Sequence, residues 1–471
     1  MNFKGISYYL SLFCFPLSFL AFVNIIYSSY FDYFLNIESY IITLIFSLIL
    51  GIVLFFLGKN SSKKIDFYEQ VSLVILIYLI SAILTAIPYY LSNYQITLVD
   101  SLFEAYSGIT GTGFSIFSNV KYLDPTLIIW RSSSQWIGGL YFLIFLVLFF
   151  SNSQFNYKLN DLVFSEKSLN PEANIQKISL KVLFLYVFLT SLIFTFFIFS
   201  GVRLFNGLNL SMTLISAGGF LPSNSLQQII KTNTQEFFLI VSFLISIFNV
   251  YLIYNLFSKK NLYREHYEDF TILLLIIVFS GLLLVTIRNL DFFDTIIMIL
   301  TSIGTSGISL NETSGNLSLY FLFLTIIGGS IISNTSGIKF IRIYILLKAS
   351  FIEILKLAKP NNIVNQNILF SEKKINDNNI RLSFLVFISF FISLFILSGI
   401  LLFDNIGFES SFKLAVLTLT NTASSGIYGL NEIEFRSLLT NSKVFLIIFM
   451  IIGKIELISF FLIIKKFLIK D

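Results

Sequence analysis

Apolar residues dominate this chain in long runs that are separated by short polar stretches. A helix needs about 20 apolar residues to cross a bilayer. Runs of that kind predict ten membrane-spanning helices, at residues 7–27, 39–57, 70–92, 128–150, 179–201, 237–257, 270–287, 318–349, 383–403 and 444–464. The first run follows Lys4, but no small-residue cleavage site comes after it, so we interpret it as a retained helix and not as a signal peptide.

Four stretches between these spans are too short and too rich in Gly, Ser and Thr to cross the bilayer themselves. Each has a polar start, about three helical turns with a semi-apolar face, and then a hydroxyl- or glycine-rich turn, here termed an elbow. The stretches are residues 100–114, 206–220, 294–308 and 412–427. Their elbows lead, at intervals of 106, 88 and 119 residues, to Gly113, Gly219, Gly307 and Gly426.

This pattern predicts a unit of span, short helix, elbow and span that repeats four times after a two-helix prefix. We divide the chain into the prefix (1–67) and four repeats (68–157, 158–266, 267–380 and 381–471), the third with a broken second helix. The predicted fold class is an all-α polytopic membrane protein with about ten transmembrane helices and four re-entrant pore loops in a pseudo-fourfold arrangement.

Four equivalent elbows have a specific use inside a membrane. Non-helical backbone is tolerated at membrane depth only within protein or beside water. Elbows that meet at one axis can line it with carbonyl oxygens, which replace the hydration shell of a cation in selectivity filters. The negative C-terminal end of each short helix also favours a cation there. A helix-packing role would explain one Gly/Ser/Thr cluster better than four in register.

Composition and charge support the membrane and give an orientation. Hydrophobic residues make up 56% of the chain and charged residues 12%, against about 25% in soluble domains. Lys and Arg fall mainly on one side of the spans, 22 against 8, which predicts an inner-membrane protein with both termini in the cytoplasm. Acidic loops on the other side fit a cation-attracting vestibule or simple tolerance equally well. The net charge of +5 reflects this topology, and no nucleic-acid partner is expected.

Few residues of the sequence are candidates for a disulfide, a metal site or catalysis. The one cysteine, Cys14, excludes an internal disulfide, and the one histidine, His266, cannot form a multi-His metal site. We interpret His266 as a solvated residue of a cytoplasmic loop, and no cofactor is expected. The rival from another class, a membrane-embedded enzyme, needs convergent catalytic groups. The sequence contains neither His-Glu-x-x-His nor Gly-x-Ser-x-Gly, and the spans hold no Asp pair.

Three motifs outside the elbows resemble the Trk/Ktr/HKT superfamily of potassium transporters, in order and on matching elements. They are Trp130-Arg-Ser-Ser-Ser-Gln-Trp-Ile-Gly-Gly139, Gly328-Gly-Ser-Ile-Ile-Ser-Asn-Thr-Ser-Gly-Ile-Lys339-Phe-Ile-Arg342 and Gly453-Lys-Ile-Glu456. The resemblance covers residues 68 to 471. The two-helix prefix looks like that of the Trk branch, so the bacterial Trk membrane subunit is the most similar class.

The resemblance implies a filter, a gate and a transported ion. The implied filter, with K+ at its four glycines, consists of Thr112, Gly113, Gly219, Ser306, Gly307, Ser425 and Gly426. Potassium preference is implied because sodium-selective relatives replace the first glycine with serine. The implied intramembrane gate consists of Gly328, Gly329, Ser333, Asn334, Thr335, Ser336 and Gly337, together with Lys454.

The residues themselves agree with such a gate. A span that is interrupted by Gly-Gly and Ser-Asn-Thr-Ser-Gly does not suit a continuous lipid-facing helix. Lys454 lies ten residues into the last span, where a lipid-facing charge is costly, so we expect it to face a water-filled pore. Glu456 would partly neutralise it, and lysine lacks the fork of the family's arginine.

Two other departures from the family are visible. Ile331 and Ile332 stand where relatives have small residues, and the fourth elbow matches loosely. The predicted function is potassium uptake, and the alternative within the superfamily is a sodium-permeable or nonselective transporter. Coupling of transport to H+ or Na+, as in a symporter, stays open. By resemblance the partners are a second copy of the chain and a cytoplasmic ring of nucleotide-binding regulatory subunits, for which residues 258–266 and 339–381 are plausible docking surfaces.

Overall fold

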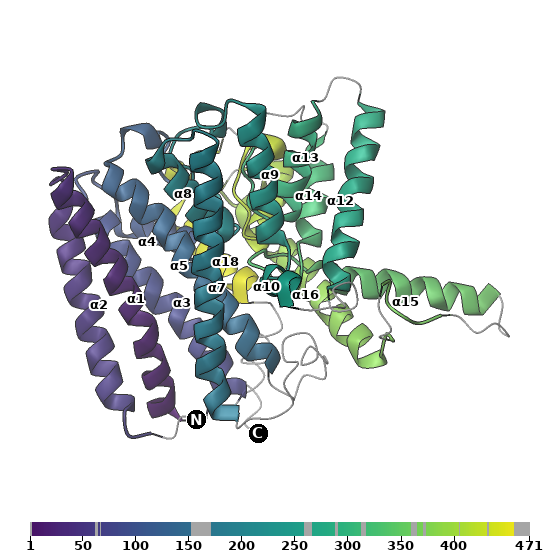
Figure 1. Ribbon diagram of the computed structural model, residues 1–471, viewed down its shortest axis with the longest axis horizontal. Helices are drawn as coiled ribbons and strands as arrows, with labels where there is room; N and C mark the ends of the chain where they lie inside the picture. The colour runs from purple at the N-terminus through teal and green to yellow at the C-terminus, as the bar shows by residue number, and fades with distance from the viewer. Residues whose placement is uncertain are drawn as a thin grey trace.

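The computed structural model describes residues 2–61, 65, 67–151, 171–258, 266–287, 291–311, 317–358, 365–370, 374–404, 406–430 and 433–455, and it is helical with no named strand in that part of the chain. Helices lie in each of the predicted spans, as far as the structure describes those spans (Figure 1). In chain order they are α1 (Phe3–Tyr30), α2 (Ile37–Gly58), α3 (Phe67–Tyr90), α5 (Pro125–Ser151), α7 (Pro171–Phe199), α9 (Asn233–Ile247) with α10 (Tyr251–Ser258), α12 (Tyr267–Thr286), α14 (Ser318–Ile327) with α15 (Phe340–Ala358), α16 (Asp377–Leu402) and α18 (Thr440–Ile455).

Six of these helices are long and apolar enough to cross a membrane, namely α1, α2, α3, α7, α12 and α16. The remaining helices are less uniform. The first half of α5 carries Arg131 and three serines, α9 and α14 have only 15 and 10 residues, and α18 is described only as far as Ile455.

Four shorter helices lie between the long ones, namely α4 (Leu98–Thr110), α8 (Leu204–Ile215), α13 (Phe292–Ile303) and α17 (Phe408–Leu419). Each has 12 or 13 residues. At 1.5 Å per residue such a helix is about 18–20 Å long, which is shorter than the hydrocarbon core of about 30 Å. The last seven residues of every one are buried. The short helices therefore end inside the protein, at the elbows.

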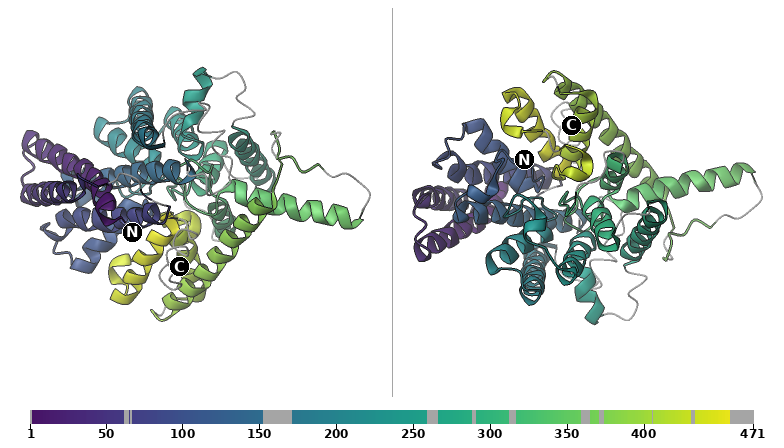
Figure 2. Two further views of the ribbon diagram at one scale, coloured as in Figure 1. Left: turned by 90° about the horizontal axis from the view of Figure 1, so that it is seen from below. Right: turned by 90° about the horizontal axis from the view of Figure 1, so that it is seen from above.

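Contacts between successive units close them into a ring. α5 packs on α8, α9 on α13, α14 on α17, and α18 returns to α4. The two end-on views of Figure 2 show helices grouped around a common centre, with α1 and α2 at one edge. α1 and α2 pack mainly on each other, and α1 also contacts α3 and α5.

The predicted helix at 237–257 is not continuous. α9 ends at Ile247 and α10 begins at Tyr251. The backbone N–H of Asn249 donates to Oδ1 of Asp269 at 2.9 Å, and that of Val250 donates to the carbonyl of Ile332 at 3.1 Å. These partners replace the helical hydrogen bonds that the break removes, which is why apolar periodicity alone did not reveal it.

The span predicted at 318–349 is broken as its glycines indicated. α14 ends at Ile327 and α15 begins at Phe340. Gly328 and Gly337 have φ angles of +68° and +82°, which residues with a side chain rarely adopt. Residues 328–339, here termed the linking segment, are folded inside the protein, whereas α15 extends sideways from the helical bundle (Figure 1).

The interpretation of His266 as a solvated residue is wrong. Its ring is buried beside the first turn of α12, and only 2% of the residue is exposed. Nε2 lies 2.9 Å from Nδ2 of Asn255, and Nδ1 lies 2.9 Å from Oδ2 of Asp269. Because the other carboxylate oxygen of Asp269 accepts from Asn249, His266 belongs to the network that supports the break after α9.

Gly138 permits the close approach of α5 to α4, and we expect its replacement to destabilise the protein. A Cβ at Gly138 would lie 1.9 Å from the carbonyl oxygen of Ile109, whereas a Cβ at Gly281 in α12 would meet nothing within 4 Å. Gly138→Ala should lower the stability by about 1–3 kcal/mol or more, because backbone has to move. Thermal unfolding in detergent, with Gly281→Ala as the control, checks this. Equal midpoints for both variants would contradict the packing.

Candidate functional site

The four elbows share one backbone register. Each contains a residue in the left-handed region, namely Gly111 (φ 79°), Ala217 (φ 53°), Thr305 (φ 52°) and Asn421 (φ 48°). Left-handed residues other than glycine are uncommon, so their recurrence just after each short helix identifies equivalent positions. In three elbows the next residue donates its backbone N–H to the carbonyl five residues earlier, at 2.9–3.1 Å: Gly218, Ser306 and Thr422.

This register makes Gly113, Gly219, Gly307 and Ala423 equivalent, and these four residues are termed the ring positions. The prediction of Gly426 and Ser425 for the fourth repeat is therefore wrong by three residues. Gly426 begins the short 3₁₀ helix η4 (Gly426–Tyr428), and Ser425 is its N-cap. The ends of the short helices agree with this register, because α8, α13 and α17 all end four residues before their ring position.

Thr422 and Ala423 were missed because glycine was taken as the marker of the fourth elbow. A signal for the correct register does exist in the sequence. Thr420-Asn421-Thr422 parallels Thr110-Gly111-Thr112, and asparagine tolerates the left-handed region better than most residues. In the structure the two threonine hydroxyls of each triplet lie 2.9 Å and 2.8 Å apart, respectively.

The ring positions lie against one another. A Cβ at Gly113 would come within 2.7 Å of Cα of Gly219, and one at Gly307 within 2.2 Å of the carbonyl oxygen of Ala423. Gly113 and Gly307 also have φ angles of +78° and +70°, which disfavour any side chain. Residues from four distant parts of the chain thus meet at one place, as the repeat predicted.

A cavity of about 660 Å³ lies beside the ring positions, and all four elbows line it. Its lining is rich in hydroxyl and amide groups. These come from Ser115, Ser118, Ser223, Asn224, Ser225, Gln227, Ser309, Asn311, Ser424 and Ser425. Glycines from all four repeats also line this cavity, so its wall combines polar side chains with peptide groups.

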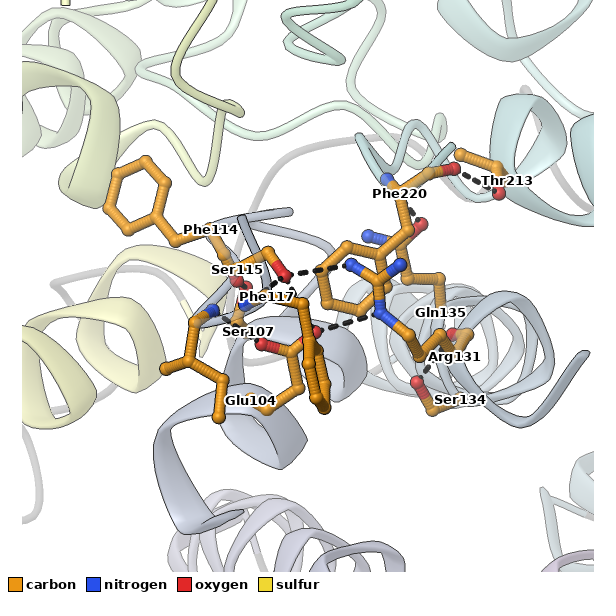
Figure 3. A network of polar contacts seen from close by, with 11 residues as sticks. Glu104, Ser107, Phe114, Ser115, Phe117, Arg131, Ser134, Gln135, Thr213 and Phe220 are labelled. Carbon is orange, nitrogen blue, oxygen red and sulfur yellow. Dashed lines mark hydrogen bonds and ion pairs between the residues drawn. The ribbon is translucent and has the colours of Figure 1, made fainter. Parts of the chain in front are cut away.

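A buried ion pair supports the first elbow (Figure 3). Nε of Arg131 in α5 lies 2.8 Å from Oε1 of Glu104 in α4, and neither side chain is more than 2% exposed. Glu104 also accepts from the backbone N–H of Ile116 at 2.9 Å and from the hydroxyl of Ser115 at 3.1 Å. Nη2 of Arg131 donates to the same hydroxyl at 2.9 Å. The pair thereby holds the segment that follows Gly113.

α5 also supports the second elbow. Arg131 lies over the ring of Phe220, with 4.2 Å between its Cζ and the ring centroid. Oε1 of Gln135 accepts from the backbone N–H of Phe220 at 3.1 Å, and the hydroxyl of Thr213 donates to its carbonyl at 3.0 Å (Figure 3). In the first elbow Ser107 donates to the carbonyl of Phe114 in the same way, at 2.6 Å.

The predicted filter hydroxyls make contacts within the protein. Oγ1 of Thr112 accepts from Nδ2 of Asn421 at 3.0 Å, so the first and fourth elbows are joined directly. The hydroxyl of Ser306 lies 2.7 Å from that of Thr301. If oxygen atoms of these elbows bind an ion, the backbone carbonyls are the freer group.

The linking segment lies against the second elbow and against the elbow of its own repeat, the third. Nδ2 of Asn334 donates to the carbonyl of Ile215 at 2.7 Å, and the backbone N–H of Ser336 donates to the hydroxyl of Thr305 at 3.0 Å. Within the segment, the hydroxyl of Thr335 lies 2.7 Å from that of Ser333 and accepts from the N–H of Gly329 at 3.1 Å. The residues predicted for the gate, from Gly328 to Gly337, thus form one compact unit.

Two lysines contact this unit. Nζ of Lys339 donates to the carbonyls of Ser330 and Ser333, both at 3.2 Å. Nζ of Lys454, which is 2% exposed, donates to the carbonyl of Asn334 at 3.1 Å and lies 4.4 Å from the centroid of Phe142. The residue predicted to neutralise Lys454, Glu456, lies outside the described residues.

Fold and site together define a class: a multi-pass helical membrane protein whose four short helices direct their elbows to one shared centre. Comparison with known families identifies the chain within that class. The sequence model of the TrkH family, described as cation transport protein, matches residues 36–310, and the chain belongs to this family. It is accordingly a transporter and not an enzyme.

Individual relatives extend the likeness over most of the chain. An uncharacterised cation transporter of Methanocaldococcus jannaschii is 28% identical, across 83% of this chain and 84% of the relative. The Trk system potassium uptake protein TrkG of Escherichia coli is 23% identical, across 89% of each chain. The crystal structure of the potassium transporter TrkH from Vibrio parahaemolyticus superposes with a TM-score of 0.85 over 98% of both chains, at 19% identity, and so shares the fold.

The ion pair of Glu104 and Arg131 makes a prediction about stability. Glu104→Gln keeps an acceptor for Ile116 but leaves the arginine charge buried and uncompensated, and we expect a loss of about 3–5 kcal/mol. Glu104→Gln combined with Arg131→Met removes both charges and should cost less than the single change. Unfolding in detergent measures both variants. Glu353→Gln, which breaks an exposed pair with Lys356, is the control and should change little. A double variant that loses as much stability as Glu104→Gln alone, or more, would contradict the pairing.

Proposed function

We propose that this chain takes up K+ across the inner membrane, as the pore-forming subunit of a potassium uptake system. The observation that carries the proposal is the meeting of four elbows, in one register, beside a polar cavity. The family transports cations. Because several relatives are named as Trk potassium uptake proteins, K+ is the first candidate among the cations.

The electrostatics of the elbows favour a cation. α4, α8, α13 and α17 all end at the ring positions, so the negative ends of four helix dipoles point at one centre. Backbone carbonyls in such a place can replace water around a dehydrated ion. In this proposal the filter consists of Thr112, Gly113, Gly219, Ser306, Gly307 and, in the corrected register, Thr422 and Ala423. A sodium-permeable or nonselective pore is the alternative that the transport experiments below distinguish.

The linking segment is the proposed gate. It contacts Thr305 and the end of α8, and Lys454 links it to the last described helix, α18. An ammonium group at this place opposes a cation that passes the ring, and the buried segment stands in its way. Opening would require the part of the segment that contacts the elbows to move.

The orientation and partners follow from the charge pattern and the resemblance. We propose that both termini are cytoplasmic, that the chain divides into a two-helix prefix and four repeats, and that two copies assemble on a cytoplasmic ring of nucleotide-binding subunits. α15 projects from the bundle with Leu347, Phe351, Ile354 and Leu357 each more than 60% exposed, which suits a protein or lipid contact. Of the proposed docking surfaces, residues 259–265 lie outside the described part of the chain. No cofactor or nucleic acid is part of this proposal.

Uptake by cells that lack their own potassium transporters tests the function. We expect the parent chain to take up K+ in preference to Na+, and Gly113→Ser to raise Na+ relative to K+ uptake. Serine would place a side chain where Gly113 has a left-handed backbone and where a Cβ meets Gly219 at 2.7 Å. Equal K+ and Na+ uptake by the parent would favour the nonselective alternative.

Gly111→Ala is the matched control for this experiment. Gly111 has the same left-handed backbone, with φ +79°, but its added Cβ would meet nothing closer than 3.7 Å. The control should reduce the amount of folded protein without altering the ratio of Na+ to K+ uptake. If it shifts the ratio as much as Gly113→Ser does, backbone strain and not crowding at the ring is the cause.

Lys454 tests the proposed gate. Lys454→Ala removes the charge and the contact with Asn334, so K+ uptake per protein molecule should rise. Lys454→Arg keeps the charge and should stay near the parent. The two variants are compared at equal membrane abundance. A fall in uptake with alanine that arginine reproduces would make Lys454 a structural residue and would contradict its role as a barrier.

A further inference from the structure

One of the four ring positions carries a side chain. Three are glycine, and two of those have backbone angles that suit only glycine. Ala423 occupies the fourth with an ordinary φ angle, so the methyl group adds no backbone strain there. It is 4% exposed and contributes to the lining of the polar cavity.

The methyl group of Ala423 reaches across the ring. A Cβ placed at Gly219 would lie 2.2 Å from Cβ of Ala423, and one placed at Gly113 would lie 2.9 Å from it. The fourth unit neighbours the first and third through α18 with α4 and α14 with α17. Gly219 belongs to the second unit, on the opposite side. A contact of Ala423 with both Gly113 and Gly219 therefore places its methyl group toward the common centre.

The backbone of the fourth elbow fixes the direction of the methyl group of Ala423. The N, C and O atoms of Ala423 lie against Gly307, within 2.2–2.9 Å of where a Cβ at that glycine would be. The backbone of Ala423 thus packs on the third elbow, and its side chain extends beyond that elbow. Nearby side chains of the same elbow make other contacts. Asn421 forms hydrogen bonds with Thr112 and Met450, and Ser424 lines the cavity.

We propose that Ala423 is a specificity-determining residue that sets an upper limit on the size of the cation that passes the ring. The inference rests on the proposed function. A methyl group offers no oxygen to an ion and cannot turn away, because it is fixed to the backbone. It narrows the place where the carbonyls of the other elbows would surround a cation. Ions larger than K+ are thereby discriminated against more strongly than a ring of four glycines would allow.

The test is uptake of K+, Rb+ and Cs+, of increasing radius, by cells that produce the parent or Ala423→Gly at equal membrane abundance. Ala423→Gly should raise the ratio of Cs+ to K+ uptake by roughly tenfold, the lower end of what one methyl group contributes to discrimination in an enclosed site. Rb+ should show a smaller rise.

Ala82→Gly provides the matched control, since Ala82 is fully buried in α3 and lies outside the ring. It removes a methyl group of the same size and should leave the Cs+ to K+ ratio unchanged. An unchanged ratio in Ala423→Gly, or an equal change in both variants, would overturn the inference while K+ uptake by the parent still supported the proposed function. A parent that takes up none of these ions would overturn the proposed function, and this inference with it.

Discussion

Backbone groups buried away from water need partners, and this requirement governs the whole interior of the protein. An unpaired N–H or C=O in a membrane costs several kcal/mol. Two long helices are nevertheless broken, after Ile247 and after Ile327. Their breaks pair with each other: the N–H of Val250 donates to Ile332 at 3.1 Å, and the N–H of Ser330 donates to Ile247 at 3.0 Å. Neither break would be tolerated without the other.

The four elbows are held in place by four different kinds of contact. The first is supported by an ion pair from α4 and α5, and the second by the amide of Gln135. The third accepts a hydrogen bond from the linking segment at Thr305, and the fourth is joined to the first through Asn421. The backbone is therefore close to fourfold, whereas the side chains that hold it are not. The segment that we propose as a gate contacts the second elbow at Ile215 and the third at Thr305.

Much of the fold could be predicted from the sequence because membrane-spanning helices and glycine-rich elbows leave strong local patterns. The break at Gly328 was visible for this reason. The break at Asn249 was not, because its partners, Asp269 and Ile332, are distant in sequence and look ordinary there. His266 was misjudged for the same reason. The fourth ring position was missed because Ala423 lacks the glycine that marks the other three, although Thr420-Asn421-Thr422 carries a weaker signal that the left-handed angle at Asn421 confirms.

The linking segment is held unevenly, which bears on how it could move. Residues 330–332 are anchored to α9, α10 and α12. Glu268 accepts from the N–H of Ile331 and the hydroxyl of Ser330, at 3.0 and 3.2 Å, alongside the two backbone bonds between the breaks.

Residues 334–336 contact the elbows and Lys454 through three hydrogen bonds of 2.7–3.1 Å and a longer one, from Nζ of Lys454 to the hydroxyl of Ser336, at 3.5 Å. Lys339 donates to several carbonyls of the segment, so those residues form one unit that includes a cation. A displacement that pivots about 330–332 breaks these outer bonds and keeps the inner ones. It therefore requires less free energy than unfolding the segment, and it leaves both helix breaks paired while the elbow at Thr305 loses its cover.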